Sequence, residues 1–165
     1  MHFAEASPAR VPAVLALGLL AGCAASPVRP TEVGTEPVAA VLDDWHDAAA
    51  QADMERYFAH FARDGIFLGT DATERWTVDE FRAYARPHFE AGRAWAFRSV
   101  RRTIVIEGHL AYFDEDLATE NLGPARGSGV LRHTPVGWRI VQYNLAITVP
   151  NEDFAAVRQA LELAE

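Results

Sequence analysis

The hydrophobic pattern of this chain changes period near residue 95, and that change limits the folds it can adopt. Up to about residue 90, large apolar residues recur every three or four positions, as on one face of a helix. From Trp95 onward they alternate with polar residues, as in strands with one buried face. Helices followed by a run of strands indicate one α+β domain, with helices packed on the concave side of a curved antiparallel sheet.

Three helices are predicted before the change of period. The first covers residues 37–49, where Pro37 suits the first turn. Asp53 can cap a second, short helix that continues to about residue 61. Thr77 and Glu80 have the spacing of a capping box, which predicts a third helix through residue 89.

The sheet is predicted from the alternating half of the chain and from one short apolar segment. Residues 66–69, "IFLG", are expected to form a brief strand. Four further strands are expected at residues 95–107, 109–119, 126–134 and 137–149. Asn151 is a candidate cap for a closing helix. The last strand has apolar residues on both faces, so we expect both faces to be covered.

The first 36 residues are not expected to belong to this domain. Residues 11–21, "VPAVLALGLLA", are too few to span a bilayer but match the apolar part of a signal peptide, with Arg10 as the only arginine before them. A segment with several prolines and few large apolar groups follows, which is typical of a tether. The expected organisation is a signal peptide at residues 1–22, a tether at 23–36 and one domain at 37–165.

Cys23 is the only cysteine, and it directly follows Leu20, Ala21 and Gly22. This arrangement resembles the lipobox of bacterial lipoproteins, in which the cysteine receives a diacylglycerol group. The alternative is a buried free cysteine after an ordinary leader. Lipidation predicts a membrane partner and a location in the bacterial cell envelope, outside the cytoplasm. A single cysteine excludes an internal disulfide and metal sites built on thiolate pairs.

The charge of the chain excludes several functions. Its net charge is −8, and it contains no lysine. An acidic surface repels phosphate backbones and anionic headgroups, so nucleic acid is not an expected partner and membrane attachment depends on the acyl chains. Without lysine, Schiff-base chemistry and a phosphate-binding loop lysine are unavailable. The six histidines show no two-ligand spacing on one element, so neither a metal site nor a cofactor is expected.

Two segments carry a resemblance to a known family. They read "VLDDWHDAAAQADMERYFAHFARDGIFLGTDATERWT" and "GSGVLRHTPVGWRIVQYNLAI". Both resemble the SnoaL-like, polyketide cyclase-like branch of the nuclear-transport-factor-2-like superfamily, over about residues 37–153. The resemblance implies a cone-shaped fold with a ligand cavity, and a homodimer formed through the sheet. It does not imply a reaction, because one fold hosts many functions.

The resemblance also indicates which catalytic groups this chain lacks. Ketosteroid isomerases of the superfamily use an aspartate base, a tyrosine and a protonated aspartic acid. The matching positions in this sequence are Gly69, Trp45 and Gly129. Because glycine cannot move a proton and an indole N–H can only donate, isomerase chemistry of that kind is not expected.

A ligand pocket is expected from aromatic and small residues at the matching positions. The alternative for the aromatic residues is plain core, since aromatic residues at helical spacing are common there. The expected pocket residues are Trp45, Phe61, Gly69, Trp76, Tyr84, Gly129, Tyr143 and Leu145. In the last strand, the Tyr143 face is expected to line the cavity, and the Trp138 face is expected to meet a partner subunit.

Asp71 is the first candidate for a general acid or base. It lies two residues beyond Gly69. Its simpler interpretation is a turn residue before the third helix. The neighbouring Glu74 and Arg75 are expected to be solvated.

Glu115 is the second candidate for a general acid or base. Alternation places it on the same face as Phe113, and if that face turns inward, a carboxylate within an apolar cone should have a raised pKa. The alternative is an ion pair with an arginine of a neighbouring strand, such as Arg101 or Arg132.

Two kinds of function are compatible with these features. The first is a lipid-anchored module without catalytic activity that binds a small, mostly apolar ligand or serves as a dimeric association domain. The second is an enzyme of the cyclase, dehydratase or hydrolase type that uses Asp71 or Glu115. The missing isomerase side chains favour the first, so catalytic activity is not the main expectation.

Overall fold

The structure, a computed structural model, describes residues 34–162. The predicted signal peptide, Cys23 and the tether up to residue 33 lie outside the described residues. The elements in chain order are α1 (Glu36–Ala50), α2 (Met54–Ala59), β1 (Phe61–Leu68), β2 (Arg75–Thr77), α3 (Val78–Glu90), β3 (Phe97–Glu107), β4 (Leu110–Thr119), β5 (Ala125–Thr134), β6 (Gly137–Ile147), η1 (Asn151–Asp153) and α4 (Phe154–Glu162).

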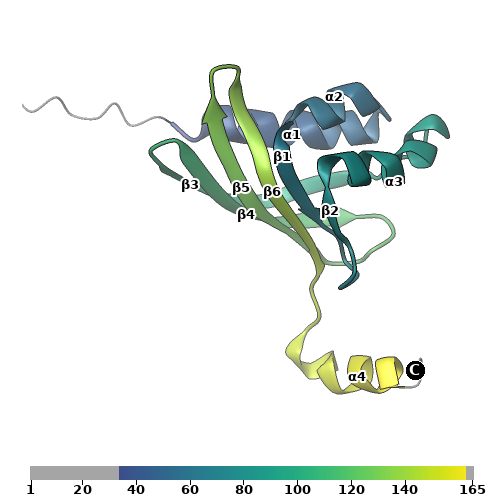
Figure 1. Cartoon of the computed structure of the whole chain (residues 1–165). Helices are drawn as coiled ribbons and strands as arrows, with labels where there is room; N and C mark the ends of the chain where they lie inside the picture. The colour runs from purple at the N-terminus through teal and green to yellow at the C-terminus, as the bar shows by residue number, and fades with distance from the viewer. Residues whose placement is uncertain (1–33, 163–165) are drawn as a thin grey trace, which may run out of the picture. The chain divides into compact units, whose positions relative to one another are not determined.

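All six strands belong to one sheet, in the order β2-β1-β6-β5-β4-β3. Strands β3 to β6 form an antiparallel meander, whereas β1 pairs in parallel with β6. The sheet curves, and α1, α2 and α3 lie against one of its faces (Figure 1). The predicted α+β cone is therefore confirmed. In chain order, β1 and β2 lie between α2 and α3.

Local sequence signals set the start of each of the three helices. Pro37 occupies the first turn of α1, and the Asp53 carboxylate accepts a hydrogen bond from the Arg56 amide at the start of α2. At α3 the predicted capping box is present, since Thr77 caps the Glu80 amide and the Glu80 carboxylate accepts from the Thr77 amide at 2.8 Å. These contacts pair amides that a helix leaves free at its start.

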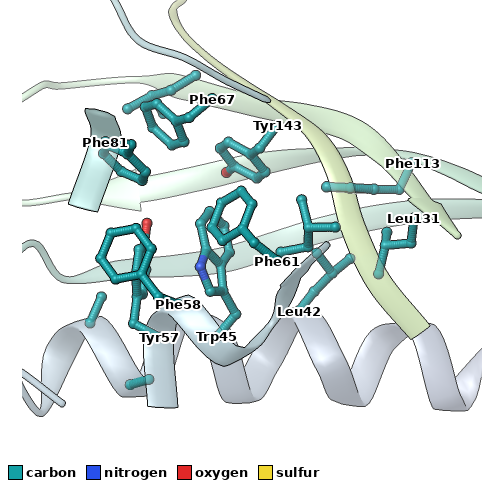
Figure 2. Close-up of a cluster of buried hydrophobic side chains, with 14 of the residues drawn as sticks. Leu42, Trp45, Tyr57, Phe58, Phe61, Phe67, Phe81, Phe113, Leu131 and Tyr143 are labelled. Carbon is teal, nitrogen blue, oxygen red and sulfur yellow. The ribbon is translucent and has the colours of Figure 1, made fainter. Parts of the chain in front are cut away.

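Aromatic side chains from both layers form the core. Between ring centroids, Trp45 of α1 lies 5.0 Å from Tyr57 of α2 and 4.5 Å from Tyr143 of β6. Phe67 of β1 and Phe81 of α3 stack at 3.9 Å. Figure 2 shows these rings filling the space between the helices and the sheet. Because burial of each large apolar side chain contributes about 1.5–3 kcal/mol, this cluster holds the helices on the sheet.

Strand β6 departs from simple alternation at Val141. The β5–β6 ladder shifts register there, so Val141 has no partner on β5. This β-bulge reverses the alternation, and Trp138 and Ile140 become part of the same buried core as Tyr143 and Leu145. The expectation that the Trp138 face meets a partner subunit is therefore wrong, because this chain covers Trp138 itself.

The last two helical elements present their side chains to solvent. Every described residue of η1 and α4 is exposed, including Phe154 and Leu161 at 56% and 65%. A nine-residue helix is marginal by itself in water. Within residues 34–162, no helix combines the length and the apolar character needed to cross a bilayer.

Candidate functional site

A cavity of about 320 Å³ opens where the end of β1 and β2 meet α3, the start of β3 and the β4–β5 connection. Its volume lies at the small end of the usual range for ligand pockets, about 300–1,000 Å³. The lining residues are Phe67, Gly69, Thr70, Glu74, Trp76, Phe81, Tyr84, Ala94, Trp95, Ala96, Phe97, Thr119, Glu120, Asn121, Leu122 and Leu145.

Five of the six aromatic rings of the cavity form a continuous series. Trp76 stacks on Tyr84 with 4.5 Å between centroids and lies nearly parallel to Phe81 at 5.6 Å. Phe81 in turn stacks on Phe67 and lies 5.8 Å from Trp95. The spacing of three residues within α3 places Phe81 and Tyr84 on the same side of that helix. Six of the sixteen residues that line the cavity are aromatic.

Glu74 lies at the place that the resemblance assigns to the missing base. The amide of Gly69 donates to the Glu74 carbonyl at 2.9 Å, which closes the turn between β1 and β2. A Cβ atom on residue 69 would overlap the Glu74 carboxylate, so the glycine makes room for this side chain. The expectation that Glu74 is simply solvated is therefore wrong, since it is half-buried and lines the cavity.

The eight predicted pocket residues divide into two groups. Gly69, Trp76, Tyr84 and Leu145 line the cavity. The other four, Trp45, Phe61, Gly129 and Tyr143, lie in the buried interior and do not line it. The plain-core alternative therefore describes Trp45, Phe61 and Tyr143, because their rings are enclosed by other aromatic side chains.

Close packing against β6 explains why residue 129 is a glycine and not an acid. A Cβ atom here would overlap the backbone carbonyl oxygen of Gln142 and lie 3.0 Å from the Phe113 ring. The bulge in β6 lies directly beside this contact. No aspartate side chain fits at residue 129 without movement of β6, so the missing acid is a consequence of the backbone geometry.

Glu115 is fully buried and belongs to a polar cluster. Its carboxylate accepts from His46 Nε2 at 2.7 Å, from Arg102 Nε at 2.8 Å and from the Tyr143 hydroxyl at 3.2 Å. Because a carboxylate only accepts, the imidazole must carry its proton on Nε2. Arg102 also pairs with Asp43 at 2.7 Å, which ties β3 and β4 to α1.

The pKa of Glu115 is lowered, not raised as its burial alone would predict. Burial raises the pKa of this carboxyl, but the hydrogen bonds and charges of His46 and Arg102 together outweigh that effect. The alternative of an ion pair with an arginine of a neighbouring strand is therefore borne out, and the partner is Arg102 of β3. The two arginines named as examples pair elsewhere, Arg101 with Asp116 and Arg132 with Asp64. Glu115 does not line the cavity.

Asp71 lies outside the cavity, in the exposed turn after β1. Its carboxylate accepts from the amide and the hydroxyl of Thr73, at 2.8 and 2.6 Å. These hydrogen bonds hold the pKa of Asp71 below its usual value. The turn-residue alternative describes this side chain, and a group that stays ionised and does not line the cavity cannot serve as its general acid.

Sequence reasoning missed Trp95, Phe97 and Glu120 as cavity residues. Trp95 and Phe97 lie where β3 begins, and their alternation is the one signal that places both on the same face. Glu120 follows β4 in a connection without periodicity, so no local pattern indicates its position. Within residues 34–162, no group of three histidine, cysteine, aspartate or glutamate side chains is arranged to hold a metal ion.

Comparison with known proteins supports the fold. A sequence profile of the SnoaL-like domain matches residues 38–150. A nuclear-transport-factor-2-like protein of unknown function from Pseudomonas putida is 13% identical, with a TM-score of 0.60 over 71% of this chain and 88% of its own. A protein of unknown function from Mycobacterium tuberculosis is 18% identical, with a TM-score of 0.62 over 73% and 75%.

A third solved structure carries a suggested activity. This proposed dehydratase of the nuclear-transport-factor-2-like family, from Streptomyces avermitilis, is 12% identical, with a TM-score of 0.60 over 70% of this chain and 96% of its own. Identities this low show a shared fold alone. Among curated proteins, no sequence matches this chain.

The fold and the cavity define the class of this protein as an α+β cone with an aromatic pocket between its helices and its sheet. The profile match covers most of the described domain. The chain therefore belongs to the SnoaL-like domain family.

Proposed function

We propose that this chain is a lipid-anchored protein of the bacterial cell envelope whose cone binds a small, mostly apolar ligand. The observation that carries the proposal is the cavity itself, about 320 Å³ in volume and walled by six aromatic side chains. Apolar walls with a few polar groups are typical of sites that bind small molecules. The polar groups at this cavity include Thr70, Glu74, Glu120 and Asn121.

The geometry argues against Asp71 and Glu115 as the acid or base of the cyclase, dehydratase or hydrolase alternative, which leaves Glu74 and Glu120 as the carboxylates at the cavity. Such an enzyme needs an acid or base within hydrogen-bond reach of the substrate. Asp71 and Glu115, the two candidates from sequence, both lie outside the cavity lining, and both have lowered pKa values. Glu115 instead joins three elements through His46 and Arg102.

Saturable binding of N-phenyl-1-naphthylamine, a neutral fluorescent probe, tests this function. Wild-type protein should enhance the probe's fluorescence saturably, and Ala94→Trp should weaken binding at least tenfold, because Ala94 lines the cavity and lies between elements where an indole can fill the space. Ala40→Trp, on the exposed side of α1, is the matched control. Equal binding by both variants, or no saturable binding by any, would refute the proposal.

We further propose a homodimer through the outer face of the sheet. Val105, Tyr112 and Val130 form one row across β3, β4 and β5, and Val105 and Tyr112 are 37% and 47% exposed in the single chain. An apolar row on a solvent face is typical of a contact between subunits. Tyr112→Glu should convert dimers to monomers in sedimentation velocity. A monomeric wild type would contradict the proposal.

A further inference from the structure

The charged side chains that line the cavity all have the same sign. Glu74 and Glu120 are the ionisable acids of the lining, and neither arginine nor histidine occurs among its residues. Arg75 and Arg93 lie close in sequence to lining residues, but both are exposed and neither lines the cavity. The cavity therefore combines a negative charge with apolar walls.

Neither of these carboxylates forms an ion pair with a described residue. Several arginines elsewhere in the domain do pair with acids, as in the contacts of Asp64 with Arg132 and of Asp116 with Arg101. The Glu74 carboxylate accepts a hydrogen bond only from the amide of Asp71, at 3.2 Å. His88 lies behind Tyr84, 5.5 Å between ring centroids, and is not part of the lining. A charge left unpaired beside an apolar cavity is available to a ligand of opposite charge.

The aromatic walls favour the same kind of ligand. The face of an aromatic ring carries negative potential and attracts a cation within about 6 Å, most strongly when the ring belongs to tryptophan. The cavity is lined by Trp76 and Trp95 together with Tyr84 and three phenylalanines, some of which also stack on one another. Rings of this kind, with carboxylates beside them, are the groups by which proteins recognise alkylated ammonium ions.

We infer that the ligand of this cavity is an organic cation: an alkylated or quaternary ammonium group on a small apolar body. This inference rests on the proposed binding function and adds the charge of the ligand to it. The rings contact the alkylated ammonium group, Glu74 balances its charge from the β1–β2 turn, and Glu120 does so from the β4–β5 connection. Anionic molecules of the same size are excluded by the two carboxylates and by the net charge of −8.

A matched pair of competitors tests the inference. Benzyltrimethylammonium and neopentylbenzene have the same shape and differ by the charge at one atom. Each is used to displace N-phenyl-1-naphthylamine from the wild-type protein. The cation should bind about tenfold more tightly than its neutral isostere. Raising the salt concentration from 0.05 to about 0.5 M should reduce the affinity of the cation several-fold and leave that of the isostere unchanged.

Variants identify the groups responsible. Glu74→Gln and Glu120→Gln should each weaken binding of the cation about threefold or more and leave binding of neopentylbenzene unchanged. Glu107→Gln, at the far end of β3 from the cavity, should change neither. Because the isostere reports on the folded cavity, a folding defect would reduce both affinities.

The outcomes separate this inference from the proposed function. If the isostere binds as well as the cation, or if both glutamine variants keep the full affinity for the cation, the charge inference is wrong and the binding function stands. If neither competitor nor the fluorescent probe binds, the proposed function fails first.

Discussion

At the scale of single residues, Glu115 shows how a buried charge can be structural. It is fully buried but surrounded by His46, Arg102 and Tyr143, which supply the hydrogen bonds that water would otherwise make. Its position in the core, and not in the cavity, assigns it to stability.

Replacement of Glu115 should therefore be costly. Glu115→Gln leaves Arg102 and His46 without their buried anion, and we expect a loss of about 3–5 kcal/mol in the free energy of unfolding at pH 7. Asp116→Asn, the neighbouring acid on the outer face, should cost no more than about 1 kcal/mol. Urea denaturation measures both, and equal effects of the two substitutions would contradict the structural role.

Glu115 should also make the stability of the folded protein decrease in acid. The pKa of Glu115 in the folded protein is below its ordinary value of 4.5. As the pH falls, the unfolded chain takes up this proton first, so the stabilisation is complete above about pH 4.5 and is lost as the pH falls through the lower folded-state value. His46, Arg102 and Tyr143 are the charged and titratable groups that contact this carboxyl.

Urea midpoints measured from pH 7 to pH 3 check this dependence. Wild type should lose stability steeply below pH 4.5, whereas Glu115→Gln should show a shallower decline. An unchanged acid slope in the variant would assign the loss to other carboxylates.

At the scale of elements, β5 and β6 can approach closely because two positions of β5 are glycines. The missing Cβ at Gly129 leaves space for the Gln142 carbonyl, and the missing Cβ at Gly127 leaves space for the Tyr143 hydroxyl. Gly129→Ala should therefore destabilise the protein by about 1–3 kcal/mol through overpacking. Gly108→Ala is unsuitable as a control because of its positive φ of 62°; Ser128→Ala, on the opposite face of β5, serves instead. A Gly129→Ala variant as stable as Ser128→Ala would contradict the packing account.

Most elements could be predicted from sequence because their signals are local, but β2 and the first half of β1 could not, and the second helix ends at Ala59 and not near residue 61. The capping box of Thr77 and Glu80 and the alternation of β3 and β4 each depend on residues a few positions apart. The bulge at Val141 could not be predicted, because alternation says nothing about an unpaired residue. For the same reason alternation places Trp138 and Tyr143 on opposite faces of the last strand, whereas both belong to the buried core.

The site was less predictable than the fold. Trp76 and Tyr84 were expected at the pocket and line it, but Trp45 and Tyr143 are equally aromatic and lie in the core. Whether an aromatic ring faces the cavity depends on how α3 packs against the sheet, and no local sequence pattern predicts that packing. Glu74 reaches the cavity only because the turn closes on Gly69.

At the scale of the whole molecule, the proposed lipid anchor on Cys23 would hold the domain and its cavity at a membrane surface. Cys23→Ala should move the protein from the membrane fraction to the soluble fraction, because a single unlipidated chain of net charge −8 has no attraction to anionic headgroups. Cell fractionation followed by immunoblotting measures this. Continued membrane association of the variant would contradict lipidation at Cys23.

The central claim is that the aromatic cavity, and not the buried polar cluster, is the site that binds a ligand. The four tryptophans report on it directly, because Trp76 and Trp95 line the cavity while Trp45 and Trp138 lie in the core. Their indole N–H resonances can be assigned by single Trp→Phe variants and followed during titration with N-phenyl-1-naphthylamine. We predict saturable shifts of the Trp76 and Trp95 resonances with little change at Trp45 and Trp138. Shifts confined to Trp45 and Trp138, or no shift at any of the four, would contradict the claim.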